Sequence, residues 1–211
     1  DLFVMYLIKE IYKTIQGEGA QSGRAAVFVR FSGCNLWTGR EKHRSTAICQ
    51  FCDTDFVGTD GVNGGKYSAE SLVKKINEIW SSKENGYIVF TGGEPMLQLD
   101  KELITECKNN NFETAIETNG TLDIDFEIDW VCVSPKAGSE LVLKHGDELK
   151  VVYPQNEFNL DVFKDMQFTH FYLQPMDSEN KDKNTTDAIN YCLKDPIWKL
   201  SIQQHKLLGI D

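Results

Sequence analysis

The chain has 211 residues, a formal net charge of −10 at pH 7 and 41% hydrophobic residues. Such an acidic surface repels a polyanion, so we expect no nucleic-acid partner. No run of 18 apolar residues occurs and no secretory signal pattern is found, so we expect no membrane span and no export. Six cysteines in a chain of this length do not suggest a secreted disulfide scaffold, and a reducing cytoplasm is expected.

Two β-rich segments come first, near residues 6–15 and 26–31, and the turn residues Gly17, Glu18 and Gly19 separate them. A glycine-rich, charged and irregular segment covers residues 33–67, and such long loops are usually functional. Ser68 is placed to cap the helix that follows. Later strands are predicted near residues 87–90, 114–116, 130–133, 149–152, 168–173 and 198–202, and helices near residues 72–80, 99–107, 158–163 and 185–193.

Strands that alternate with helices favour a largely parallel sheet with helices packed outside it. We therefore predict an α/β fold, a shortened and partial (β/α) barrel, because a full barrel needs roughly 250 residues. Residues 1–211 are expected to form one domain. Nearly every predicted strand ends in a polar cluster, which indicates an active site at the C-terminal ends of the strands. The clusters are residues 91–94, 117–120, 134–136, 174–177 and 203–205.

Three cysteines have the spacing of metal ligands. Fourteen residues separate Cys34 from Cys49, and two residues separate Cys49 from Cys52, so that the last two sulfurs can face one metal centre. Zinc would need a fourth protein ligand, for which His43 is the nearest candidate, whereas an iron–sulfur cluster tolerates three thiolates. The spacing alone leaves both alternatives open. The other cysteines are expected in the core: Cys107, Cys132 and Cys192.

The turn Thr91-Gly92-Gly93-Glu94-Pro95, placed downstream of these cysteines, resembles the radical S-adenosylmethionine (SAM) superfamily, in which such a turn binds the amino group of SAM. The resemblance implies a [4Fe–4S] cluster with one open iron and a barrel of the radical SAM type. Residues 34–67 would then be the cluster loop with an insertion.

The wider sequence is similar to the 7-carboxy-7-deazaguanine synthase family, which shares the long gap after the first cysteine. The matching stretches are residues 16–19, 30–37, 49–55, 91–95, 117–120, 134–136, 174–177 and 205–206. The similarity implies conversion of 6-carboxy-5,6,7,8-tetrahydropterin to 7-carboxy-7-deazaguanine and ammonia, in queuosine and deazapurine biosynthesis. In this family a 5′-deoxyadenosyl radical takes hydrogen from C6, the ring contracts, and SAM is regenerated.

The similarity also implies roles for individual residues. The metal ligands would be Cys34, Cys49 and Cys52 for the cluster and Thr54 for Mg²⁺. The SAM-binding residues would be Phe51, Cys52, Asp53, Gly93, Glu94, Ser134, Pro135, Lys136, Gln174, Pro175, Met176 and Asp177. The substrate-binding residues would be Ile15, Gln16, Gly17, Glu18, Arg30, Thr91, His205 and the terminal Asp211. No role is assigned to Glu117.

Plainer alternatives exist for several of these residues. Thr54 could stabilise a turn. Arg30 could clamp the substrate carboxylate or simply be ion-paired. Gln16 and Glu18 could read a pterin edge or be turn residues, and His205 could be an ordinary core or surface histidine.

The similarity implies an electron donor such as flavodoxin or ferredoxin, and a homodimer. Two other functions compete with this interpretation. A glycyl-radical activase would use the same cofactor, but it would have a shorter cysteine spacing and a groove for a peptide. A small zinc or iron–sulfur binding module would lack catalysis.

Overall fold

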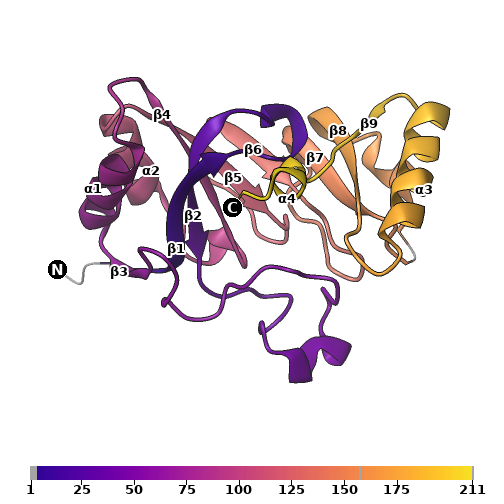
Figure 1. Ribbon diagram of the computed structural model, residues 1–211, viewed down its shortest axis with the longest axis horizontal. Helices are drawn as coiled ribbons and strands as arrows, with labels where there is room; N and C mark the ends of the chain where they lie inside the picture. The colour runs from indigo at the N-terminus through magenta and orange to yellow at the C-terminus, as the bar shows by residue number, and fades with distance from the viewer. Residues whose placement is uncertain (1–3, 157, 211) are drawn as a thin grey trace.

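The computed structural model describes residues 4–156 and 158–210, which form a nine-stranded sheet in the order β3-β1-β2-β4-β5-β6-β7-β8-β9 (Figure 1). The strands are β1 (Tyr6–Ile15), β2 (Ala25–Phe31), β3 (Gly65–Tyr67), β4 (Gly86–Gly92), β5 (Phe112–Thr118), β6 (Trp130–Val133), β7 (His145–Tyr153), β8 (Gln167–Pro175) and β9 (Trp198–Leu200). The helices are α1 (Ala69–Trp80), α2 (Lys101–Asn109), α3 (Lys181–Lys194) and α4 (Gln204–Leu208), with 3₁₀ turns η1 (Gly19–Gln21), η2 (Glu41–Thr46), η3 (Pro95–Leu97) and η4 (Leu160–Phe163).

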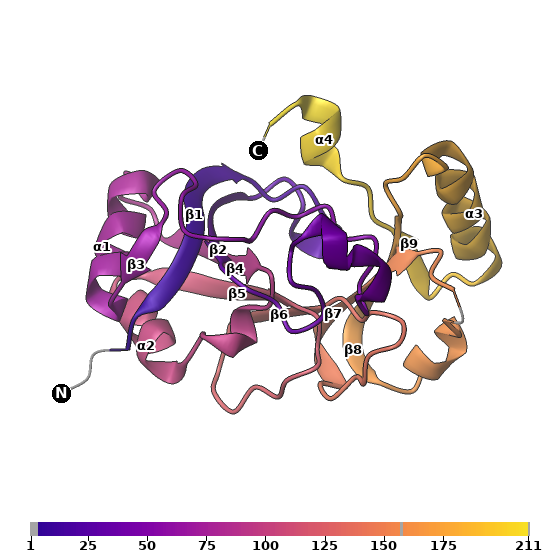
Figure 2. The ribbon, with the colours of Figure 1, turned by 90° about the horizontal axis from the view of Figure 1, so that it is seen from below.

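Strand β2 and strands β4 to β9 pair in parallel, each with its neighbour in the sheet, whereas β1 pairs antiparallel with β2 and with β3. The predicted partial barrel with mostly parallel strands is therefore confirmed. Because β3 and β9 form the two edges of the sheet, the barrel is open. Helices α1 and α2 lie at one end of the sheet and α3 at the other (Figure 2).

The side chains of β2 pack alternately on the two faces of the sheet. Val27, Val29 and Phe31 are fully buried in the core shared with α1 and α2. The intervening Ala26 and Phe28 pack in a separate cluster with Tyr87 of β4. Successive side chains point to opposite faces of a strand, so one face of β2 holds the helices and the other lines the barrel interior.

Helix α1 begins as the sequence predicts, because the Ser68 hydroxyl accepts a hydrogen bond from the backbone N–H of Ser71. Its apolar stripe is buried against the sheet, including Leu72, Val73 and Ile76. A second core joins α3 to the other end of the sheet; its members include Leu149, Val151, Leu173, Ala188 and Trp198.

The structure differs from the sequence predictions at several short elements. Residues 158–163 hold only the 3₁₀ turn η4 in place of a helix, and the final strand ends at Leu200. The segment 33–67 contains η2 and β3, and α4 was not predicted as a helix. Cys107 and Cys132 are buried as expected, whereas Cys192 is only partly buried. No helix in the described ranges is long and apolar enough to cross a membrane.

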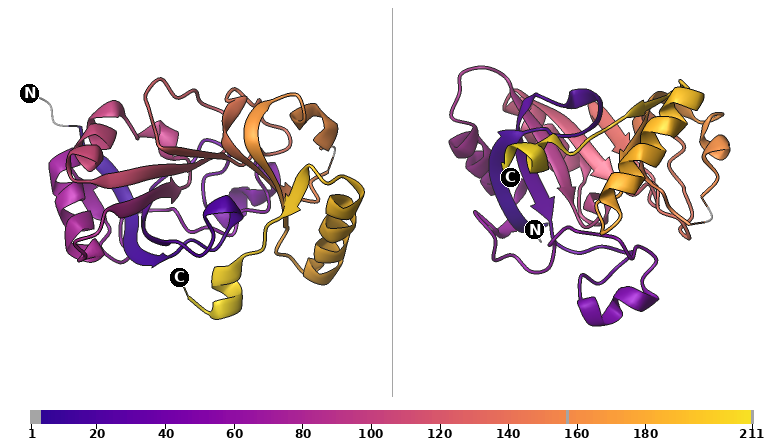
Figure 3. Two further views of the ribbon diagram at one scale, coloured as in Figure 1. Left: turned by 90° about the horizontal axis from the view of Figure 1, so that it is seen from above. Right: turned by 45° about the vertical axis from the view of Figure 1, so that its right-hand side comes forward.

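The tip of the β1–β2 hairpin bridges the open barrel. Within it, the backbone N–H of Gly19 donates to Ser201 Oγ at 3.0 Å, and that of Ala20 donates to Glu148 Oε2 at 2.9 Å. The N–H of Gln204 donates to the carbonyl of Gly17 at 3.0 Å, which ties the start of α4 to the hairpin. Figure 3 shows that α4 lies apart from α3, on the side of the N-terminal strands.

Candidate functional site

A pocket lies at the C-terminal ends of the strands and contains the three thiols of Cys34, Cys49 and Cys52. We call it the thiol pocket. Its other lining residues are Glu18, Leu36, Trp37, Phe51, Asp53, Thr54, Phe56, Thr91, Gly92, Gly93, Glu117, Thr118, Asn119, Ser134, Lys136, Lys150, Val152, Gln174, Pro175, Met176, Asp177 and Gln203. Four of the five predicted polar clusters each contribute two or more residues to the lining of this pocket. The fifth cluster, residues 203–205, contributes Gln203.

The three thiols differ in how readily they ionise, and burial raises the pKa of Cys34. A hydrogen bond from the Cys49 thiol is the main cause that lowers the pKa of Cys52 to about 6, and the same hydrogen bond raises the pKa of Cys49. The Cys34 sulfur accepts the backbone N–H of Leu36 at 3.4 Å. Burial lowers the pKa of Lys136, although the nearby Cys49 and Cys52 favour its charged form. A thiolate is the form of cysteine that binds metals.

Among residues 4–156 and 158–210, no group of three or more His, Cys, Asp or Glu side chains is placed to hold a metal ion. The candidate zinc ligand His43 instead contacts the Thr38 hydroxyl at 2.8 Å and does not line the thiol pocket. The feature that fits a cluster is that three thiols open into one pocket.

The cluster loop is anchored by Arg44. Its guanidinium lies 4.0 Å from the centre of the Trp37 ring and donates hydrogen bonds to the carbonyls of Gln50 and Cys52. Trp37 packs edge-on against the buried Phe56. These contacts fix the backbone on both sides of Cys49 and Cys52, so the thiols keep their positions relative to the pocket.

The glycine-rich turn is fitted to the protein's own backbone. A side chain at Gly93 would place its Cβ 1.9 Å from the carbonyl oxygen of Gly33, and one at Gly92 would meet the Phe31 carbonyl at 2.3 Å. The N–H of Glu94 donates to the Gly33 carbonyl at 2.9 Å. Glycine is required here because the turn lies directly against the cluster loop.

Glu94 lies beneath this turn and has no exposed surface. Its carboxylate accepts hydrogen bonds from the Met96 N–H, the Thr118 hydroxyl and the Asn119 N–H, at 2.7–3.0 Å. Burial raises the pKa of Glu94, against the effect of these donors. Glu94 therefore holds the ends of β4 and β5 together and does not line the thiol pocket.

A second pocket lies beside the first, under the β1–β2 hairpin, and we call it the hairpin pocket. It is lined by Glu10, Tyr12, Ile15, Gln16, Gly17, Glu18, Phe28, Arg30, Asp53, Thr54, Asp55, Thr91, Glu117, Gln203, His205 and Lys206. Six residues line both pockets: Glu18, Asp53, Thr54, Thr91, Glu117 and Gln203. The two pockets therefore share a wall.

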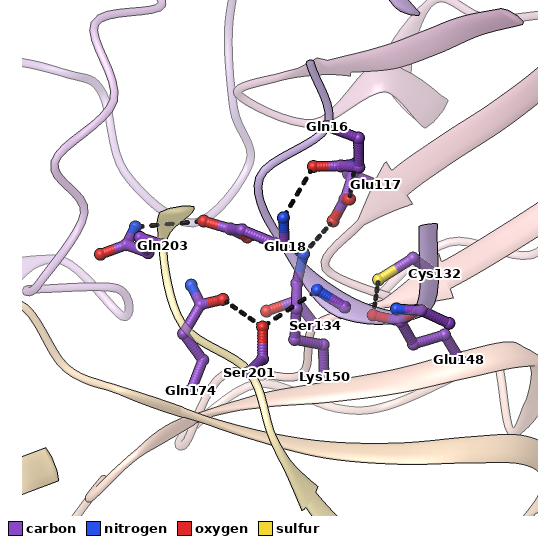
Figure 4. Close-up of polar contacts among 12 residues, drawn as sticks. Gln16, Glu18, Glu117, Cys132, Ser134, Glu148, Lys150, Gln174, Ser201 and Gln203 are labelled. Atoms are coloured by element: carbon purple, nitrogen blue, oxygen red, sulfur yellow. Dashed lines mark hydrogen bonds and ion pairs between the residues drawn. The ribbon is translucent and has the colours of Figure 1, made fainter. Parts of the chain in front are cut away.

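A network of charged and amide side chains lies at this wall (Figure 4). Lys150 Nζ is 2.7 Å from Glu18 Oε2 and 2.8 Å from Glu117 Oε2. The Gln203 amide donates to the other oxygen of Glu18, and the Gln16 amide donates to the other oxygen of Glu117. Burial alone would raise the pKa of Glu18, but Lys150 outweighs it and lowers this pKa to about 2.

Arg30 and Lys206 hold the rim of the hairpin pocket. Arg30 Nε donates to Glu10 Oε1 at 2.7 Å and its Nη2 donates to the Tyr12 hydroxyl at 3.0 Å, so the guanidinium is ion-paired. Lys206 of α4 donates to Asp53 at 2.7 Å and to Asp177 at 2.6 Å. The C-terminal segment is thereby tied to both the cluster loop and the end of β8.

The structure brings nearly all of the predicted site residues to these two pockets. The exceptions are Glu94 and Pro135, which line neither pocket, and Asp211, which lies outside the described residues. Lys150 and Gln203 were missed, and Glu117 was left without a role. The one available signal for Lys150 was a lysine within the apolar run Leu149–Val152 of β7.

Comparisons with known proteins agree with this geometry. Residues 43–176 match the model of the Radical SAM superfamily. The chain is 55% identical over 207 residues to the 7-carboxy-7-deazaguanine synthase of Bradyrhizobium diazoefficiens and 54% identical to that of Bordetella pertussis, covering 97% of this chain and 99% of each relative. The crystal structure of QueE from Escherichia coli is similar with a TM-score of 0.72 and 26% identity, over 95% of both chains.

Proposed function

The chain belongs to the 7-carboxy-7-deazaguanine synthase family of the radical SAM superfamily, and from this membership we propose that it converts 6-carboxy-5,6,7,8-tetrahydropterin to 7-carboxy-7-deazaguanine and ammonia, a step of queuosine and deazapurine biosynthesis. The observation that carries the proposal is the shared wall of the thiol pocket and the hairpin pocket. A cofactor enzyme must hold the reactive atom of its cofactor against the substrate. Two adjoining pockets meet that requirement.

Cys34, Cys49 and Cys52 are the residues that would hold a [4Fe–4S] cluster, with one iron left for SAM. The three thiols open into one pocket, and the lowered pKa of Cys52 supports binding as thiolate. When bound, the cluster and SAM supply the radical chemistry that takes a hydrogen atom from the substrate. Lys136, Gln174 and the other residues at the strand ends would bind and orient SAM and exclude water from it.

The hairpin pocket would hold the pterin. Two hydrogen bonds occupy two of the five N–H donors of the Arg30 guanidinium, so Arg30 can pair with Glu10 and still donate to a substrate carboxylate. Gln16 and Glu18 would bind the N–H donors and acceptors of the ring edge, and His205 would donate from the C-terminal segment.

We further propose Mg²⁺ at Thr54 and an electron donor such as flavodoxin or ferredoxin. Thr54 lies two residues after Cys52 and lines both pockets, where its hydroxyl can contribute one of the few protein oxygen ligands that Mg²⁺ usually takes. Arg40 and Lys42 are exposed beside the cluster loop, which suits an acidic donor protein.

A homodimer is the proposed assembly. Apolar side chains stay exposed around β9 and α4, including Ile197 at 40%, Ile202 at 39% and Leu207 at 70%. Large exposed apolar side chains can mark interaction surfaces, which supports a second copy packed against the C-terminal part of the chain.

The test is anaerobic turnover. Cluster-loaded, reduced protein is incubated with SAM, Mg²⁺ and 6-carboxytetrahydropterin, and products are identified by mass spectrometry. We expect 7-carboxy-7-deazaguanine with ammonia, and no net loss of SAM per turnover. A loaded protein that cleaves SAM but leaves the pterin unchanged would contradict the proposal, and a glycyl radical formed on an added protein would favour an activase.

A further inference from the structure

One ammonium group at the shared wall holds two carboxylates that come from distant parts of the chain. Lys150 lies in the middle of β7, Glu18 at the hairpin tip and Glu117 near the end of β5. The two ion-pair distances are 2.7 and 2.8 Å, and both carboxylates line both pockets (Figure 4). Lys150 therefore fixes the relative position of the two carboxylates at the wall that the thiol pocket and the hairpin pocket share.

The side chains of Lys150, Glu18 and Glu117 differ in their exposed fraction, and this difference indicates different roles. The Lys150 side chain is 4% exposed, whereas those of Glu18 and Glu117 are 18% and 20% exposed. Lys150 lines the thiol pocket but not the hairpin pocket, so a molecule in the hairpin pocket would meet the carboxylates in front of the ammonium group. Lys150 is thus placed behind the groups that face the ligand.

Both carboxylates keep the capacity to bind a ligand. Glu18 Oε1 accepts the Gln203 amide at 3.1 Å, and Glu117 Oε1 accepts the Gln16 amide at 3.2 Å. An ionised carboxylate offers about four acceptor sites. With one oxygen on Lys150 and the other on an amide, each carboxylate is held at both ends and can still accept an N–H from a ligand.

The charges around Lys150 explain why an ammonium group is needed. Glu18 and Glu117 face it from the hairpin and β5, Glu148 lies two residues away on β7, and the Cys132 thiol approaches from β6. Like charges packed this closely disfavour ionisation unless a cation lies between them. Lys150 is the cation that compensates for Glu18 and Glu117 together.

We propose that Lys150 is a positioning residue for the reaction, which holds Glu18 and Glu117 as a paired set of acceptors for the N–H donors of a flat, donor-rich heterocycle. This inference rests on the proposed function, in which the heterocycle is the pterin. Lys150 acts through the two carboxylates and does not itself touch the substrate.

The test compares Lys150→Met, Lys150→Arg and the matched control Lys164→Met in cluster-loaded protein. Lys164 also bridges two carboxylates, Asp161 and Asp195, at 2.7 and 2.6 Å, but it lines neither pocket. Binding of 6-carboxytetrahydropterin and of SAM is measured separately under anaerobic conditions, with KM and kcat. We expect Lys150→Met to weaken pterin binding by about 30-fold and to weaken SAM binding much less, because Lys150 lines the thiol pocket but its two carboxylate partners also line the hairpin pocket.

Lys150→Arg keeps the positive charge, so it should restore much of the pterin affinity, and Lys164→Met should leave both affinities unchanged. If Lys150→Met does not fold, the double variant with Glu117→Gln removes one of the repelling charges; it should bind SAM normally and the pterin weakly. Unchanged pterin binding, or equal losses of pterin and SAM binding without rescue by arginine, would overturn the inference. A wild-type protein that does not bind the pterin would refute the proposed function, and this inference with it.

Discussion

Cys34, Cys49 and Cys52 reach the thiol pocket from two sides, and each has a different environment. Cys34 follows β2, whereas Cys49 and Cys52 lie in the loop that Arg44 anchors, where a hydrogen bond from the Cys49 thiol lowers the pKa of Cys52. The other cysteines have no access to this pocket. Cys107 is fully buried on the core-facing side of α2, where burial raises the pKa of its thiol to about 12.

This contrast predicts which cysteines bind iron. Replacing Cys34, Cys49 or Cys52 by alanine should remove most of the bound iron and all turnover, because each contributes one of three thiolates. Cys107→Ala is the control and should keep full iron. Iron and sulfide analysis of the anaerobically purified variants gives the answer, and full iron occupancy in Cys52→Ala would contradict the assignment.

Thr54 allows a second test at the scale of a single residue. Thr54→Ala should weaken the stimulation of turnover by Mg²⁺, because one hard oxygen ligand is lost. SAM binding should change little, since most of the pocket wall is retained. Turnover is measured across a Mg²⁺ titration; a titration curve that matches wild type would remove Thr54 from the site.

At the scale of elements, the β1–β2 hairpin tip is constrained by the strand it faces. Gly19 has φ of 62°, and a Cβ there would lie 1.9 Å from Glu148 Oε1. Gly23, on the same hairpin, also has positive φ, at 91°, but nothing lies within 4 Å of its Cβ position. Substitutions at Gly19 and Gly23 therefore separate the cost of backbone strain from the cost of a clash with Glu148 on β7.

Gly19→Ala should therefore lower the free energy of unfolding by more than Gly23→Ala, which carries only a backbone cost of about 1–3 kcal/mol. Gly19→Ala should also weaken pterin binding, because Glu18 is the neighbouring residue. It should leave SAM binding nearly intact. Denaturant unfolding and ligand titration of both variants check this. Equal stability losses in the two variants would show that the tip does not depend on its fit to Glu148.

The long elements were predictable from sequence because their periodicity is extended. The pattern of Leu72, Val73 and Ile76 identified α1, and the first β-rich run matched β1. The three residues of β3 and the five of α4 carry too little pattern, and β3 is defined by pairing with β1. Lys150 was missed because its role depends on long-range partners, which lie 33 and 132 residues away in the sequence.

At the scale of the whole molecule, the C-terminal segment with α4 meets the β1–β2 hairpin beside the hairpin pocket. Lys206 ties α4 to Asp53 and Asp177, and the backbone of Gln204 bonds to Gly17. Sequence similarity implies a substrate-binding role for His205, which stays a prediction; in the structure His205 lines the hairpin pocket together with Gln16 and Glu18. The contribution of Asp211 stays a prediction.

Removal of residues 207–211 tests that contribution. The truncated protein keeps Lys206 and its two ion pairs, so SAM binding should barely change. Pterin binding should weaken by about 1–3 kcal/mol, the cost of leaving one buried polar group unpaired. Both affinities are measured anaerobically, and an unchanged pterin affinity would show that the last five residues do not close the site.

The bond between Gly17 and Gln204 also has a consequence for synthesis on the ribosome. The hairpin that carries Gln16 and Glu18 is made early, but the segment that completes its pocket is made about 180 residues later. A nascent chain can form β1, β2 and the cluster loop before Gln203 and Gln204 have left the exit tunnel. The hairpin pocket is therefore completed only after α4 has been synthesised and has folded back onto the hairpin, long after the three cysteines are available.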